Sequence, residues 1–122
     1  MAILTNLMGT GTPGGQARAI QGKATLAQNA VGASQGSLTL PSEITVYTTS
    51  TASNGPTLPS GNVGDVYVIA NSSANTINIW PPVGGYIQSA AVNAADTVLA
   101  GRTAYYICIG GLNYVHLQGA AA

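Results

Sequence analysis

Apolar and polar residues alternate along most of the chain from Ser37 onward. In the stretch EITVYTTS, Ile44 and Val46 alternate with Thr45 and Tyr47, which is the two-residue period of a β-strand. The same alternating pattern occurs in the stretches SLTLP, TINIWPP, TAYYICIG and YVHLQ. These stretches are separated by Gly, Asn, Ser and Pro residues that favour turns. GDVYVIAN is apolar on both faces, which predicts a central strand covered on both sides.

Short strands joined by such turns predict an all-β fold for residues 37–122, a small antiparallel β-sandwich or barrel of jelly-roll-like arrangement. One strand must end at Trp80, because Pro81 and Pro82 cannot donate hydrogen bonds to a sheet. Gly84 and Gly85 then allow positive φ angles for a tight reversal. This stretch predicts a structural corner, with Trp80 at the edge of a core or of a subunit contact.

Residues 1–36 differ from the rest of the chain in composition, with a glycine-rich GTGTPGG stretch followed by small and polar residues. Ile20, Ala24, Ala27 and Val31 would share one helical face, but the small side chains and Gly22 make this a weak helix. We therefore expect residues 1–36 to be an extended N-terminal arm, which could include a short helix and which orders on contact with a partner. The alternative is a flexible terminus.

The chain has very few charged residues, which limits the partners that its surface can attract. Only three residues of 122 are basic and three are acidic, giving no net charge, while 46% are hydrophobic. A neutral surface does not attract nucleic acid or an anionic membrane, so we expect neither as a partner. It does favour association with other proteins. The charged residues are Arg18, Lys23, Arg102, Glu43, Asp65 and Asp96.

The inventory of reactive side chains argues against an enzyme. His116 is the only histidine and Cys108 the only cysteine, so a zinc site within one chain would lack ligands, and Cys108 is expected to be a buried apolar residue. A triad could combine His116 with a serine and Asp65 or Asp96, but the chain has no GxSxG motif between a strand and a helix. Both aspartates are expected to accept backbone hydrogen bonds in turns. We therefore predict no catalytic residue, no metal site and no cofactor.

The stretch from about Ile44 to Leu117 resembles small β domains on the virion surface of tailed phages, found in head decoration (cement) proteins and in some head-fibre and tail-fibre proteins. It covers about 60% of the chain. Trp80 stands where such domains often carry Tyr, and residues 1–36 have no counterpart. The order and spacing of the following positions carry the resemblance: Leu58, Pro59, Gly64, Asp65, Asn71, Asn75, Trp80, Pro81, Gly85, Ile87, Asn93, Ala94, Leu99, Ala100, Gly101, Arg102, Gly110, Tyr114 and His116.

The resemblance implies a structural protein that binds the outer surface of a phage capsid, made in the host cytoplasm and working as a homotrimer with the major capsid protein as partner. In this interpretation the arm contacts the shell, and the β domain forms the subunit contact through Trp80, Tyr105 and Tyr106. The arm residues expected at the shell are Ile3, Leu4, Leu7, Arg18 and Lys23.

Two alternatives remain open at this point. The first is a fibre or receptor-binding β module of the same family that recognises a host-surface glycan, for which Trp80 and the tyrosines could stack on sugar rings. The second is an unrelated secreted lectin, although the start of the chain has no signal-peptide pattern and a single cysteine cannot form a disulfide within the chain.

Overall fold

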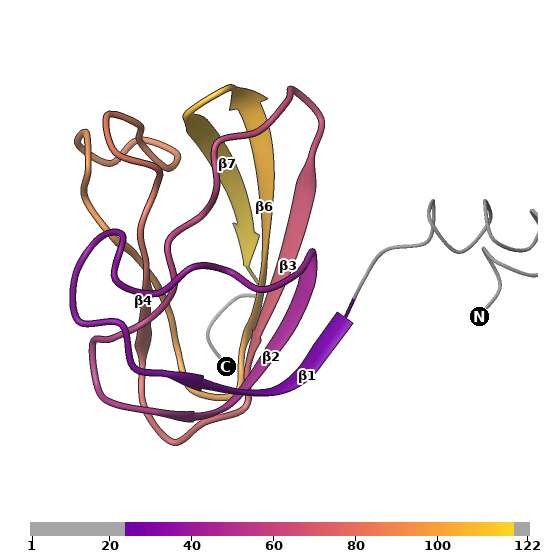
Figure 1. Ribbon diagram of the computed structural model, residues 1–122, viewed down its shortest axis with the longest axis vertical. Coiled ribbons are helices and arrows are strands. Elements are labelled where there is room, and N and C mark those ends of the chain that lie inside the picture. Colours follow the sequence, from indigo (N-terminus) through magenta and orange to yellow (C-terminus); the bar gives the residue numbers. More distant parts are fainter. Residues whose placement is uncertain (1–23, 119–122) are drawn as a thin grey trace, which may run out of the picture.

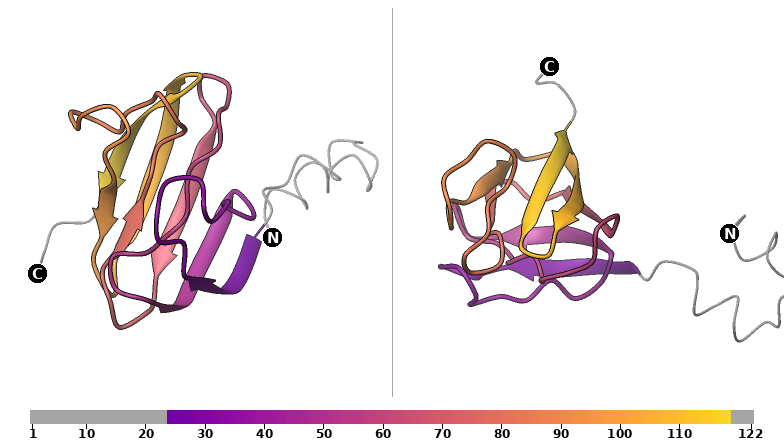
Figure 2. Two further views of the ribbon diagram at one scale, coloured as in Figure 1. Left: turned by 60° about the vertical axis from the view of Figure 1, so that its left-hand side comes forward. Right: turned by 90° about the horizontal axis from the view of Figure 1, so that it is seen from above.

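The computed structural model describes residues 24–118 and is all-β, as the alternation predicts. Five strands form a main sheet in the order β1-β2-β3-β6-β7, and two short strands, β4 and β5, form a second sheet (Figure 1). The second sheet and the loops beside it make a second layer, around which the main sheet curves (Figure 2). The strands are β1 (Ala24–Ala30), β2 (Ile44–Ser50), β3 (Val66–Asn71), β4 (Ile77–Ile79), β5 (Asp96–Val98), β6 (Thr103–Gly110) and β7 (Asn113–Gln118).

The main sheet is mixed, which corrects the expectation of a purely antiparallel sandwich, and it does not close into a barrel. β1 pairs parallel with β2, and β2 pairs parallel with β3. Parallel neighbours require the chain to return to its starting end between strands. Here the returning segments run through the second layer, where Thr57 N–H donates to Leu38 O at 2.8 Å and Leu58 N–H donates to Trp80 O at 2.8 Å. β6 and β7 then add antiparallel strands.

The core lies between the main sheet and the second layer. Because the chain has no Phe, tyrosines provide the largest core side chains, and Tyr47, Tyr106 and Tyr114 are at most 1% exposed. Cys108 is buried, as predicted. The hydroxyl of Tyr47 has no hydrogen-bond partner among the described residues. The other buried apolar residues are Ala30, Leu40, Leu58, Ile69, Ile77, Ile79, Ile87, Val98 and Ala104.

The corner after Trp80 forms as predicted, but its two glycines act differently. Gly84 has a φ of +88°, which favours glycine. Gly85 is required for space instead, because a Cβ atom there would lie 1.9 Å from the backbone oxygen of Leu112. The corner is therefore held close to the turn between β6 and β7.

The predicted boundary at residue 36 falls inside the folded domain. Residues 24–30 form edge strand β1, so the helical face expected from Ala24, Ala27 and Val31 is wrong. Ala30 is fully buried, and Gly55 N–H donates to Gly32 O at 2.9 Å, so this stretch is part of the sandwich rather than an arm. The remaining arm residues, including the expected shell contacts Ile3, Leu4, Leu7, Arg18 and Lys23, lie outside the described residues.

Candidate interaction surface

The main sheet carries a second set of apolar side chains on the face that points away from the core, which we name the outer sheet face. Strand register aligns its residues in rows across the sheet. Ile44 of β2 pairs with Val68 of β3, Val68 pairs with Tyr105 of β6, and Tyr105 pairs with Leu117 of β7. A neighbouring row consists of Val66, Ile107 and Val115. Neither row contains a charged residue.

The outer sheet face is uncovered within the described residues. Leu117 is 65% exposed and Tyr105 is 46% exposed. Leu26 on β1 and Val66 and Ile109 near one end of the sheet are also exposed. A sheet that is apolar on both faces normally has both faces covered. The expectation that GDVYVIAN is a central strand is confirmed, since β3 lies in the middle of the sheet, but only one of its faces is covered by described residues.

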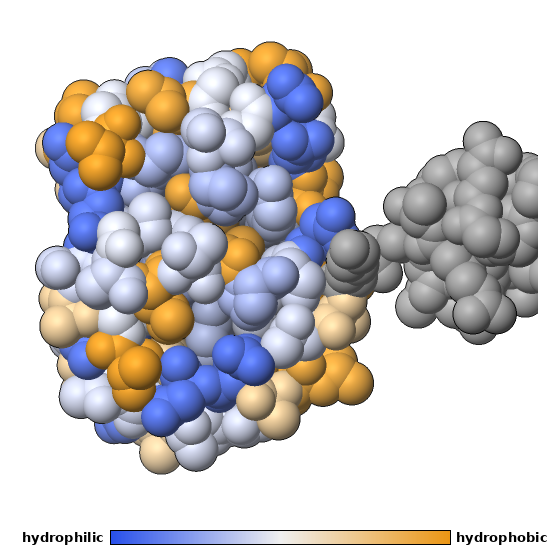
Figure 3. Space-filling view, viewed as in Figure 1, coloured by the Kyte–Doolittle hydropathy of each residue, from blue (hydrophilic) through white to orange (hydrophobic). Residues whose placement is uncertain are grey.

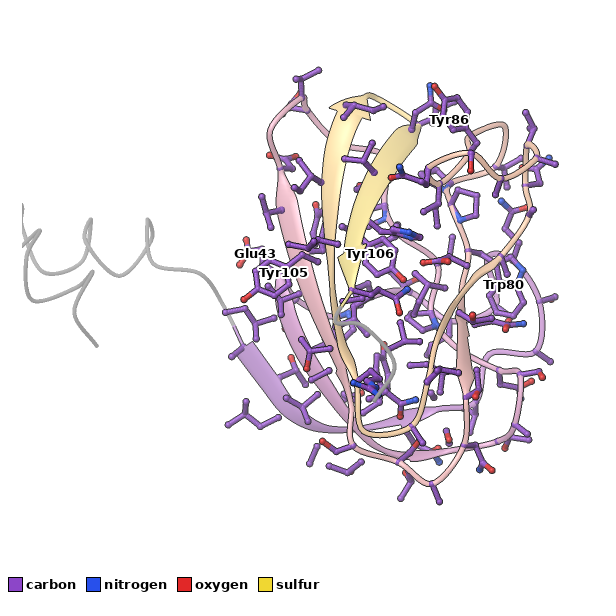
Figure 4. All side chains as sticks on the ribbon, turned by 180° about the vertical axis from the view of Figure 1, so that it is seen from behind. Glu43, Trp80, Tyr86, Tyr105 and Tyr106 are labelled. Atoms are coloured by element: carbon purple, nitrogen blue, oxygen red, sulfur yellow. The ribbon has the colours of Figure 1, made fainter. Side chains whose placement is uncertain are left out.

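The three residues expected to form the subunit contact do not share a surface. Tyr105 lies on the outer sheet face, whereas Tyr106 points to the opposite side of β6 into the core (Figure 4). Tyr106 is fully buried, so its assignment as a contact residue is wrong. Trp80 is half-buried in the second layer, on the far side of the molecule from Tyr105 (Figure 4). Of the three, Tyr105 alone belongs to the outer sheet face.

Asp96 on β5 gathers three polar side chains of the main sheet. One oxygen, Oδ2, accepts hydrogen bonds from the Tyr106 hydroxyl at 2.7 Å, from His116 Nδ1–H at 2.8 Å and from Gln118 Nε2–H at 3.1 Å. The expected turn role of Asp96 is therefore wrong, whereas Asp65 does accept the Asn62 N–H at 2.8 Å. Burial, and then the charge and hydrogen bond of Asp96, raise the pKa of Tyr106.

His116 and Asp96 are two of the residues that a catalytic triad could have combined. In the structure their hydrogen bond links the two layers. The His116 side chain is 30% exposed, and no serine or threonine hydroxyl hydrogen-bonds to its ring within residues 24–118. The described part of the chain also shows no pocket and no group of three His, Cys, Asp or Glu side chains placed to hold a metal ion. The visible contacts of the pair tie β5 to β6 and β7.

Comparisons with protein-family models, with curated proteins and with solved structures find no match to this chain. None of the described residues belongs to a helix that is long and apolar enough to cross a membrane.

Proposed function

We propose that this chain is a structural virion protein, without enzymatic activity, that binds the outer surface of a tailed-phage capsid and decorates or stabilises it as an oligomer. Its partners under this proposal are the major capsid protein and further copies of itself, and the expected assembly is a homotrimer. The observation that carries the proposal is the uncovered outer sheet face, because an exposed apolar surface of this kind marks an association site.

The size of the outer sheet face is adequate for association. Five strands spaced about 4.8 Å apart and about 20 Å long offer roughly 500 Å² on each copy. Three copies that each bury the whole face remove about 1,500 Å² from solvent in total, which is about 500 Å² at each of the three contacts. Because the sheet curves around the second layer (Figure 2), its outer face is convex, and a convex face can touch two neighbours at once. This geometry supports the trimer that the resemblance implies.

The positions that carry the resemblance have structural roles, which supports the family proposal. Gly64 and Gly101 adopt φ angles of +95° and +78°, in which glycine is favoured. Asn71 is buried and its amide donates to Asn75 O at 2.7 Å and to Val98 O at 2.9 Å. These residues form the turns at the ends of β3 and β5, so their order along the chain reflects a particular path of the backbone.

The first experiment measures the mass of the purified full chain by analytical ultracentrifugation. We expect a trimer, and we expect the double variant Tyr105→Ser, Leu117→Ser to sediment as a monomer because it removes two apolar side chains from the centre and edge of the outer sheet face. Leu99→Ser is the matched control, since Leu99 is 46% exposed but lies outside that face. A monomeric wild-type chain, or a double variant that keeps the wild-type mass, would contradict self-association through this face.

The second experiment locates the protein by immunogold electron microscopy of the parent particle. Label over the head is expected for a decoration protein. Label confined to the tail tip would contradict the capsid role and favour the fibre or receptor-binding module, with glycan binding as the next assay. Absence of label from every particle would contradict a virion role altogether.

A further inference from the structure

Four loop tips at one end of the sandwich each present one aliphatic side chain to solvent. They are Val63, Val83, Val92 and Leu112, which are 75%, 72%, 59% and 39% exposed. We name this end, where β3 begins and β6 passes into β7, the loop pole. The loops that form it lie at the top of Figure 1, and hydrophobic side chains are visible there in Figure 3.

The distribution of exposed apolar residues separates this end from the rest of the surface. Eleven large hydrophobic residues are exposed among residues 24–118. Five of them belong to the outer sheet face and four to the loop pole, so only Val31 and Leu99 lie elsewhere. Scattered single residues would need no explanation, but a cluster on one end indicates a contact surface. The two surfaces adjoin, because Val66 and Ile109 are at the end of the sheet nearest the pole.

Backbone hydrogen bonds hold the loops of the pole to one another. Gly61 N–H donates to Gly111 O at 2.9 Å, and Gly64 N–H donates to Cys108 O at 2.8 Å. On the other side, the Asn93 side chain accepts the Gly84 N–H at 2.7 Å, while Asn93 N–H donates to Gly85 O at 2.8 Å. The tips are therefore already ordered, which lowers the conformational entropy lost when they bind.

The chemistry of the pole favours an apolar protein surface as its partner. Its charged side chain is Asp65, whose carboxylate accepts a hydrogen bond from the backbone of residue 62. The one basic residue between positions 24 and 118 is Arg102, which lies at the opposite end, where its carbonyl accepts the Asn71 N–H. Loops that dock on lipid usually combine apolar tips with Lys, Arg or Trp, and the loop pole has none of these, although the half-buried Tyr86 lies at this end (Figure 4).

Residues 24–118 of a second copy are a poor match for the same tips. Separate protruding side chains need hollows to receive them, and the described residues contain no pocket. We infer that the loop pole inserts Val63, Val83, Val92 and Leu112 into apolar hollows of a different, uncharged protein surface. This inference rests on the proposed function, under which the partner surface belongs to the capsid shell. The loop pole then attaches the oligomer to the shell, and the outer sheet face holds the copies of the oligomer together.

Cosedimentation with parent heads stripped of this protein tests the inference, using the full-length double variant Val63→Ser, Val83→Ser. Burial of one valine side chain stabilises the bound state, so we expect each Val→Ser substitution to raise the Kd for heads about tenfold. Leu99→Ser, at the other end of the molecule, should bind like wild type. Because Val63 and Val83 are exposed, the double variant should keep the wild-type thermal unfolding and oligomer mass, which excludes misfolding as the cause of weaker binding.

The other outcomes separate this inference from the proposed function. Wild-type protein that does not bind heads would contradict both. Wild type and double variant that bind equally well would overturn the role of the loop pole and leave capsid decoration standing. A double variant of reduced oligomer mass would show that the pole contacts a second copy, and flotation of wild type with phosphatidylcholine vesicles would show that it docks on lipid; each result overturns the inference.

Discussion

Asp96 provides a cluster of polar contacts that joins the two layers, in addition to the buried core. It comes from the short strand β5, yet its carboxylate receives hydrogen bonds from Tyr106 on β6 and from His116 and Gln118 on β7. The Tyr106 ring also lies edge-on to the His116 ring, with centroids 6.3 Å apart. Hydrogen bonds to a charged group are stronger than those between neutral groups.

Replacing Asp96 by Ala should lower the free energy of unfolding by about 1–3 kcal/mol, because the buried Tyr106 hydroxyl then loses its acceptor. Tyr106→Phe removes one of the three donors and leaves the carboxylate bound to the other two, so it should cost less, about 0.5–1.5 kcal/mol. Urea unfolding of the two variants and wild type measures both values. A cost of Tyr106→Phe equal to or above that of Asp96→Ala would show that the carboxylate does not hold the layers together.

Tyr105 and Tyr106 show how far the sequence predicts which individual side chains are buried. Tyr105 and Tyr106 are adjacent on β6, so the period of two must place them on opposite faces. The alternation therefore excluded a shared contact surface, although it did not say which tyrosine was buried. That choice depends on which face of the sheet the second layer covers, a tertiary property that the local pattern does not contain. The bonding of Asp96 was hidden for the same reason.

At the scale of elements, the strands with large alternating side chains were predictable and the others were not. β2, β4, β6 and β7 lie in stretches identified from alternation, and β3 lies in the stretch that is apolar on both faces. β1 has the sequence ATLAQNA and β5 has only three residues within an Ala- and Asn-rich stretch, so neither shows a strong strand pattern. Their formation depends on pairing with distant partners, namely β2 and β4. The parallel pairings were equally hidden, because they follow from the path of the connecting loops.

β1 belongs to the folded domain, and two N-terminal truncations of the chain test this. Removal of residues 1–23 leaves the described sandwich complete, so the thermal unfolding midpoint should change little. Removal of residues 1–36 deletes β1 with the buried Ala30 and exposes the edge of β2. Loss of a paired strand should abolish cooperative unfolding or lower the midpoint by more than about 10 °C. Equal midpoints for the two truncations would contradict a structural role for β1.

At the scale of the whole molecule, the sandwich combines very few charges with two exposed apolar surfaces. The outer sheet face and the loop pole adjoin, and both gain stability from burial rather than from ion pairing. Since salt screens charged contacts but not apolar ones, assembly and attachment should both persist at high ionic strength. The same scarcity of charge means that ionisation at alkaline pH falls mainly on the tyrosines.

Alkaline pH should therefore unfold this protein through its tyrosines. Burial raises the pKa of Tyr47, Tyr106 and Tyr114, so the folded state keeps their protons while the unfolded state releases them above its ordinary pKa of about 10. The unfolded state then binds fewer protons, and stability falls as the pH rises. These three groups should lower the free energy of unfolding by about 4 kcal/mol per pH unit above pH 10, and their contribution is constant below pH 10. Burial also raises the pKa of Tyr67, which should add to this slope.

Tyr47→Phe is the matched variant for this alkaline prediction, because the Tyr47 hydroxyl is buried without a partner among the described residues. Removing that hydroxyl should be nearly neutral or stabilising at pH 7. Above pH 10 the variant should lose stability less steeply, by about 1.4 kcal/mol per pH unit, because one ionisation is gone. Urea unfolding from neutral to alkaline pH, at one protein concentration so that assembly stays constant, measures both slopes. Identical slopes for the variant and wild type would mean that Tyr47 has the same pKa in the folded and unfolded states. Burial of Tyr47 would then not contribute to alkaline unfolding.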